Sequence, residues 1–236
     1  MFGRGAARAA AFFVAMLAAS SVVAAPINLV TNGDFSSGPI GFTTSYDYAP
    51  APCSVHPDCA GEYWVAPLAT DWWPGYVGTA DHTTGTGNMF LANGKETPNV
   101  VWASTVNGLT QNTNYFFEGW LMNICCAHST APGPQLQFYA NNMLLGVGAT
   151  DTPGLWSGVS TIWNSGSSTS VLLQLINASS ALTGNDFALD DVYLGTESAI
   201  DPGVTPAPMP EPASIFLLGA GLVTVARRAR RSSKPC

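Results

Sequence analysis

Two neighbouring carboxylates near the end of the sequence are the residues best placed to do chemistry. Phe187 and Leu189 share one face of an expected strand, and Val192 and Leu194 share another, but the two pairs are out of phase. A β-bulge at Asp190-Asp191 restores the phase and directs both carboxylates to one place. Because Ca²⁺ prefers carboxylate and carbonyl oxygens, we expect these two residues to hold a structural calcium ion.

The calcium prediction extends to the start of the sequence. Asn32 and Asp34 come near the bulge if the first strand pairs with the last, and Glu62, Asp81 and Asp186 are looser candidates. The alternative is that these side chains cap turns, because Asp and Asn readily bond to the backbone two residues on. Both interpretations remain open from the sequence.

Four of the five cysteines are disulfide candidates, because Cys236 lies in the C-terminal tail. The four are Cys53, Cys59, Cys125 and Cys126. An oxidising compartment favours disulfides, and four cysteines allow three pairings. A bond between adjacent cysteines is strained, so we favour two cross-links from the 53–59 loop to residues 125–126. A zinc site that adds His56 and His128, or a reactive thiol, is the alternative.

Signatures of catalysis are weak. His82 follows Asp81, but neighbouring residues on a strand point to opposite faces, which argues against an acid–base pair. Neither a Gly-x-Ser-x-Gly nor a His-Glu-x-x-His motif occurs. Nothing selects a pair of carboxylates for glycoside hydrolysis. We therefore expect no enzymatic activity.

Aromatic residues gather in the segment from residue 63 to residue 76. Exposed rings on such a loop could form a flat platform for sugar rings, and the candidates are Trp64, Trp72, Trp73 and Tyr76. Ordinary packing at the end of the core is the alternative. Four other tryptophans lie within strand patterns, where we expect core or sheet-face packing: Trp102, Trp120, Trp156 and Trp163.

The charge distribution excludes nucleic acid as a partner. Fifteen acidic residues lie between residues 26 and 212, with Lys95 as the single basic residue among them. One lysine cannot neutralise a phosphate backbone. The same count excludes a P-loop nucleotide site, which needs a lysine. It also excludes Schiff-base chemistry, unless Lys95 is the reacting lysine.

The two ends of the chain indicate export. Arg4 and Arg8 precede an apolar stretch and small residues, which predicts a helical secretory signal peptide over residues 1–25, cleaved after Ala24. Residues 197–209 are rich in proline and predict an extended linker. The uncharged segment 213–226 predicts a helix of ~21 Å, shorter than the ~30 Å hydrocarbon core of a bilayer.

The C-terminal residues 210–236 resemble the PEP-CTERM sorting signal. They hold its three parts in order: Pro210, Glu211 and Pro212, then the apolar helix, then Arg227, Arg228, Arg230 and Arg231. In that family a membrane transpeptidase, exosortase, recognises the signal and the tail is removed. The resemblance implies export across the inner membrane of a Gram-negative bacterium that makes extracellular polysaccharide. It also implies transient anchoring by the C-terminal helix, with the cell surface or extracellular matrix as destination.

The segment 26–196 is expected to fold as one all-β domain, an antiparallel β-sandwich. The chain has 24 glycines and 17 prolines, and no helix-period segment of useful length. Expected strands are residues 27–31, 61–66, 88–93, 99–106, 114–124, 135–140, 155–164, 169–177 and 186–194. This spacing predicts a jelly roll.

A second resemblance covers residues 28–195 and is to galactose-binding-like jelly rolls. It rests on NGDF at residues 32–35, DHTTG at 81–85 and NDFALDD at 185–191. Related carbohydrate-binding modules hold a structural Ca²⁺ where the first and last strands meet, and Ser36 stands where the family often has Glu. The resemblance implies a non-enzymatic exported protein that binds carbohydrate or exopolysaccharide. The alternatives are a purely structural or adhesive matrix protein without a glycan pocket, and a secreted glycan hydrolase.

Overall fold

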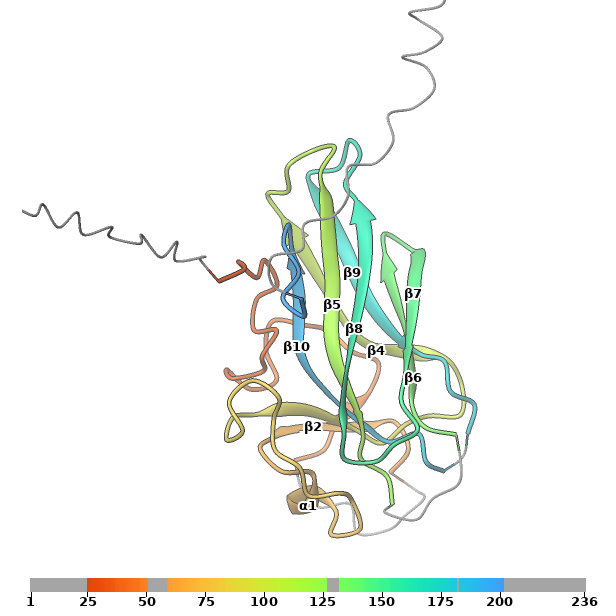
Figure 1. Ribbon diagram of the computed structural model, residues 1–236. Helices are drawn as coiled ribbons and strands as arrows, with labels where there is room; N and C mark the ends of the chain where they lie inside the picture. The colour runs from red at the N-terminus through yellow and green to blue at the C-terminus, as the bar shows by residue number, and fades with distance from the viewer. Residues whose placement is uncertain (1–24, 51–58, 127–131, 182, 202–236) are drawn as a thin grey trace, which may run out of the picture.

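The computed structural model describes residues 25–50, 59–126, 132–181 and 183–201, which form two β-sheets and one short helix (Figure 1). The expected signal helix and C-terminal helix, and the proline-rich linker beyond residue 201, lie outside the described residues. Within the described ranges, no helix has the length and apolar character needed to cross a membrane.

Six strands form the larger sheet. Its order is β1 (Asp47–Tyr48), β2 (Glu62–Ala66), β3 (Met89–Ala92), β10 (Phe187–Gly195), β5 (Asn114–Asn123) and β8 (Trp156–Asn164). All neighbours are antiparallel except β1 and β2. The last strand, β10, therefore lies in the middle of this sheet, between β3 and β5.

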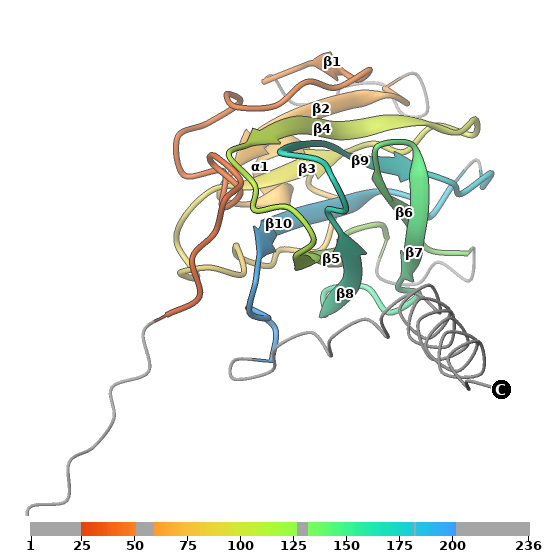
Figure 2. The same ribbon diagram turned by 90° about the horizontal axis from the view of Figure 1, so that it is seen from above.

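Four strands form the smaller sheet, in the order β4 (Asn99–Asn107), β9 (Ser170–Asn177), β6 (Gln135–Ala140) and β7 (Met143–Ala149). The two sheets share one core: Phe117 of β5 meets Phe138 of β6 edge-on, with ring centroids 5.0 Å apart. Figure 2 shows the same strands from above. The expected all-β, antiparallel jelly-roll sandwich is confirmed.

A second, smaller cluster of buried side chains lies on the outer face of the larger sheet. The helix α1 (Ala69–Trp72) covers part of that face, and Trp72 packs there beside Leu91 and Met122. The larger sheet is therefore covered on both faces near α1. The part of its outer face that carries the site described below lies farther along β10 and β5.

The β-bulge expected at Asp190-Asp191 is confirmed. The pairing of β10 with β5 jumps from Asp190 opposite Trp120 to Tyr193 opposite Glu118, and Asp191 has a φ of 48°. The extra residue restores the phase, because the pairs Phe187/Leu189 and Val192/Leu194 all belong to the shared core.

One expected strand is wrong, and two strands, β1 and β7, were not expected. Residues 27–31 form no strand, because the Asn28 side chain takes over strand-like bonds: its Oδ1 accepts from Leu194 N and its Nδ2 donates to Val192 O. The segment still runs beside β10, with Leu29 N bonded to Leu194 O and Val192 N to Gly33 O. The strand β7 was not expected, since its two glycines weaken the alternating pattern.

Candidate functional site

The bulge brings both aspartates to one loop, the segment 81–87. Asp190 Oδ2 accepts hydrogen bonds from the backbone N–H groups of His82 and Thr83, at 2.9 and 3.2 Å. Asp191 Oδ2 lies 2.7 Å from His82 Nδ1, and the Thr83 hydroxyl donates to Asp191 Oδ1 at 2.7 Å. Two residues of β10 therefore fix the position of His82.

The two carboxyl groups lie in different surroundings. Asp190 is fully buried, whereas the Asp191 side chain is 29% exposed. Burial, followed by the charge of Asp191, raises the pKa of Asp190 to about 7, against the opposing effect of its N–H donors. Asp190 therefore orders the loop, and Asp191 is the carboxylate that a ligand can reach.

Aromatic rings surround His82. Its imidazole stacks on the indole of Trp120, with centroids 3.9 Å apart and planes 18° apart, and meets Trp156 edge-on at 5.8 Å. The Trp156 Nε1 donates to Ala80 O and so holds the start of the same loop. The result is a layered stack whose imidazole side chain remains 30% exposed.

A hollow of about 290 Å³ opens beside this stack on the outer face of the larger sheet. Its walls include His82, Trp120, Asp191, Glu118, Tyr193 and Ile200. We call this hollow the bulge pocket. It combines ring faces with a small number of polar atoms, the composition typical of small-ligand sites.

One wall of the bulge pocket is the chain leaving the domain. Glu118, buried on β5, accepts hydrogen bonds from Ser198 Oγ, Ala199 N and Ile200 N, at 2.7, 2.7 and 3.2 Å. Its Oε1 also accepts from Ser160 Oγ on β8. These hydrogen bonds are structural, and the Glu118 carboxylate serves as an anchor for residues 198–200.

The four residues expected to hold calcium do not converge. Asn32 Nδ2 donates to Gly38 O and Ile40 O, and Asp34 Oδ1 accepts from Ser36, so both bond within their own turn. The carboxylates of Asp190 and Asp191 already accept hydrogen bonds from backbone N–H groups and from the Thr83 hydroxyl. This donor set does not fit a calcium ion, although calcium binding itself stays a prediction. In the described ranges, no group of three or more His, Cys, Asp or Glu is arranged to hold a metal.

The looser calcium candidates also have other roles or positions. Asp81 folds the loop, since its carboxylate accepts from Thr84 N and Gly87 N at 2.8 and 2.7 Å. It does not pair with its neighbour His82, whose partner is Asp191. Asp186 is buried at the start of β10, and burial raises its pKa to about 7.

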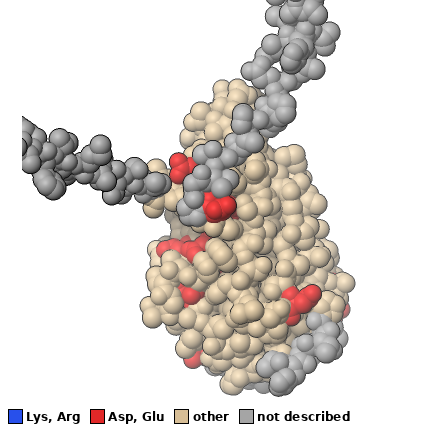
Figure 3. All heavy atoms as spheres, viewed as in Figure 1, with Lys and Arg blue, Asp and Glu red and all other residues tan. Residues whose placement is uncertain are grey.

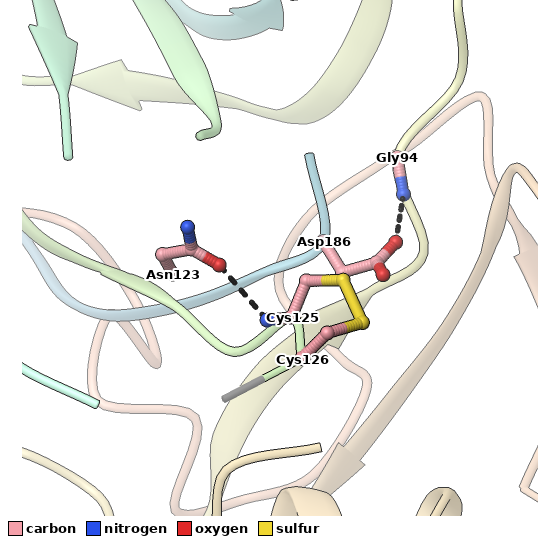
Figure 4. Close-up of a disulfide and its surroundings, with 5 residues drawn as sticks. All are labelled: Gly94, Asn123, Cys125, Cys126 and Asp186. Atoms are coloured by element: carbon pink, nitrogen blue, oxygen red, sulfur yellow. Dashed lines mark hydrogen bonds between the residues drawn. A yellow bond between two sulfur atoms is a disulfide. The ribbon is translucent and has the colours of Figure 1, made fainter. Parts of the chain in front are cut away.

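The favoured pairing of the cysteines is wrong. Cys125 is bonded to Cys126, next to the carboxylate of Asp186 (Figure 4). The backbone permits this because Cys126, just beyond the end of β5, has a φ of 42°. Cys59 is also disulfide-bonded, so these three thiols are not free zinc ligands. Cys53, His56 and His128 lie outside the described residues.

The expectation of an exposed aromatic platform is wrong for Trp72 and Tyr76, two of its four residues. Trp72 and Tyr76 are buried in the cluster near α1, and Trp64 and Trp73 pack against that cluster. Packing, the alternative, describes this segment. A short helix turns the Trp72 ring inward, which the run of loop-forming residues around it did not indicate.

The ring that does line a pocket is Trp120, for which the strand pattern predicted core or sheet-face packing. A signal was available: on β5, Phe117 and Leu121 face the core, so Glu118 and Trp120 share the outer face. No pattern in the sequence predicted the contact between His82 and Asp191, because the two residues are 109 positions apart.

Comparisons with known proteins identify the C-terminal segment. The PEP-CTERM protein-sorting motif matches residues 210–231. The chain carries this sorting signal. The motif implies an exported protein that exosortase sorts and that is transiently anchored to the membrane. Its residues, including Pro210, Glu211, Pro212 and Arg227, lie outside the described part of the chain. A search of curated proteins gives no match.

Several solved structures are similar to this chain at low sequence identity. A C-terminal sugar-binding domain of EclA is 18% identical with a TM-score of 0.36, and the match covers 40% of this chain and 66% of that one, just under two thirds. A cyclase from Fischerella sp. TAU is 15% identical with a TM-score of 0.48, covering 73% and 96%. A family 16 carbohydrate binding module is 18% identical with a TM-score of 0.41, covering 71% and 99%.

Proposed function

We propose that this exported protein binds carbohydrate in the bulge pocket, without catalysis. It would act at the cell surface or in the extracellular polysaccharide matrix of a Gram-negative bacterium. One observation carries the proposal: the imidazole–indole stack of His82 and Trp120 and the exposed carboxylate of Asp191 line one hollow. The sorting motif at residues 210–231 supports the location.

The chemistry of the bulge pocket suits a sugar ring. A sugar presents a flat apolar C–H face and a rim of hydroxyl groups, so it needs a ring surface and a few polar atoms at the edge. The exposed side of the His82–Trp120 stack supplies the first. Asp191, a carboxylate that accepts hydrogen bonds, supplies the second.

The hydrogen bonds around the acids argue for binding rather than hydrolysis. Glycoside hydrolysis needs two carboxyl groups that can reach the scissile bond from opposite sides. Among the acids at the bulge pocket, Asp190 is buried behind the loop and Glu118 anchors residues 198–200. Of these three acids, Asp191 is the one with an exposed side chain, which suits recognition.

The test is affinity electrophoresis of the full-length chain, purified in mild detergent, through gels that contain a panel of polysaccharides. We expect retardation by at least one of them. His82→Ala and Asp191→Asn should each weaken binding about tenfold, the effect of ~1.4 kcal/mol in binding free energy. Asn tolerates the left-handed backbone of residue 191, so the second variant should keep its fold.

The matched control is Asp71→Asn, which removes an exposed carboxylate on α1, away from the bulge pocket. It should bind like the wild type. Retardation that both site variants leave unchanged would move the sugar site elsewhere. No retardation in any gel would favour the purely structural or adhesive alternative.

A further inference from the structure

We propose that the glycan bound in the bulge pocket is neutral, with no carboxylate or sulfate groups on the sugars that enter it. This inference rests on the proposed function and names its ligand class. It is carried by the distribution of charge over the domain, by the position of Lys95, and by the groups that line the pocket.

Positive charge is almost absent from the domain. Between residues 26 and 201, Lys95 is the single Lys or Arg of the sequence. Figure 3 shows the face that carries β10, β5 and β8, where acidic groups are scattered and no Lys or Arg is visible. Proteins that recognise carboxylate, sulfate or phosphate commonly use Arg or Lys, because these groups pair with anions.

Lys95 is not available to the bulge pocket. Its ammonium lies 5.6 Å above the ring of Tyr46, and its carbonyl accepts from Asn177 and Asn185. Asn185, which contacts Lys95, lies just before β10, and Asp191 lies six residues farther along the chain. At about 3.3 Å per residue, Asn185 and Asp191 are ~20 Å apart, which is about two Debye lengths at 0.1 M salt.

The pocket itself is acidic. Asp191 and Glu118 line it, and Asp190 lies directly behind Asp191. The basic group that faces them is His82, and Asp191 already occupies its Nδ1. A sugar carboxylate placed here would meet like charges with no Arg or Lys to pair with, which is unfavourable at short range.

Neutral sugars meet no such obstacle. Their hydroxyl groups can donate to the free lone pairs of Asp191, and their C–H faces can cover the exposed side of the His82–Trp120 stack. The volume of about 290 Å³ is near the lower limit of ligand pockets, so a short stretch of the chain should enter rather than a long segment.

The experiment compares matched polysaccharides that differ in charge alone. The full-length chain is tested against dextran, galactan and a β-glucan, and against carboxymethylated and sulfated derivatives of the same backbones. We expect binding to at least one neutral backbone, and at least tenfold weaker binding to its two anionic derivatives at low salt. Added salt should narrow this difference, since it screens the repulsion.

Two variants separate the pocket from the net charge of the protein. Asp191→Asn should reduce the neutral-to-anionic affinity ratio several-fold, whereas Asp71→Asn, which changes the net charge equally, should leave the ratio unchanged. Equal reductions by both would show that the pocket sets no preference, which contradicts the inference.

The outcomes for the inference and the proposed function are distinct. Anionic derivatives that bind as tightly as the neutral backbone, or more tightly, would overturn the inference and leave carbohydrate binding intact. Failure to bind every polysaccharide in the panel would overturn the proposed function, and the inference with it.

Discussion

At the scale of single residues, two buried carboxyl groups on or next to β10 determine how the protein responds to pH. Burial raises the pKa of Asp186 and Asp190 to about 7, whereas both groups titrate near 3.8 in an unfolded chain. Between these values the folded protein holds protons that the unfolded chain has released. The folded state is thus stabilised below the lower value and loses that stabilisation as the pH rises.

We therefore predict that the free energy of unfolding falls between pH 4 and pH 7 and then levels off. The limiting slope for each group is about 1.4 kcal/mol per pH unit. Urea unfolding followed by tryptophan fluorescence at several pH values measures it. A free energy of unfolding that rises over this range would contradict the assignment.

Asp186→Asn isolates one of the two groups. The variant can keep the bond from Gly94 N to Oδ1 while removing the titration, so the slope should fall by up to half. Asp71→Asn on α1, an exposed group, should leave the slope as it is in the wild type.

At the scale of elements, the contact between the N-terminal segment and β10 depends on the absence of a side chain at Gly33. A Cβ atom at this position would overlap the carbonyl oxygen of Val192, which immediately follows the bulge. The backbone bond from Val192 N to Gly33 O fixes this approach. The NGDF sequence therefore contributes through its glycine.

We predict that Gly33→Ala lowers the free energy of unfolding by about 3 kcal/mol or more, because the segment must move away from β10. Gly38→Ala is the matched control in the same segment. Gly38 has a φ of 78° with no atom near its missing Cβ, so alanine should cost about 1 kcal/mol of backbone strain. Equal losses in chemical denaturation would show that residue 33 makes no tight contact.

The anchor formed by Glu118 joins β5 to the chain leaving the domain. We predict that Glu118→Gln loosens residues 198–200, because a neutral amide oxygen accepts weaker hydrogen bonds from the Ala199 and Ile200 N–H groups than a charged carboxylate does. Weakening these charged hydrogen bonds costs about 1–3 kcal/mol, so the amide groups of residues 198–200 should exchange at least roughly tenfold faster than in the wild type. Hydrogen exchange with mass spectrometry measures this change.

Ser160→Ala is the control for the anchor. It removes the partner of Glu118 on β8 but leaves the bonds to residues 198–200. Exchange in those residues should stay within a few-fold of the wild type. Slow exchange in both variants would mean that other contacts hold the exit segment.

At the scale of the whole molecule, calcium should contribute little to stability. The four expected ligands do not converge, and protein donors already surround Asp190. A ligand raises the melting temperature only if it binds the folded state preferentially. We predict the same melting temperature for the full-length chain with added Ca²⁺ and with excess chelator, measured by differential scanning fluorimetry.

Magnesium in place of calcium controls for ionic strength in that measurement. A drop in melting temperature on chelation that calcium restores and magnesium does not would reinstate a calcium site at the bulge. It would then require the contacts of His82 and Thr83 with the two aspartates to rearrange.

Much of the architecture was determined by the sequence alone. Alternation of apolar residues and the positions of turns predicted the sandwich and most of its strands, because each strand must present one face to the core. The bulge at Asp190-Asp191 was predictable for the same reason, since only an extra residue brings Val192 and Leu194 into phase. The sorting signal was predictable because its parts are adjacent in sequence.

The tertiary structure alone decided which residues form the site. His82 meets Asp191 because the loop at residues 81–87 and the bulge on β10 lie at the same place on one sheet, a contact that no local pattern specifies. The short helix α1 turned Trp72 inward, and the outer face of β5 brought Trp120 to the pocket. Local periodicity fixes which face a side chain occupies, but the packing of distant segments decides whether that face is covered or open.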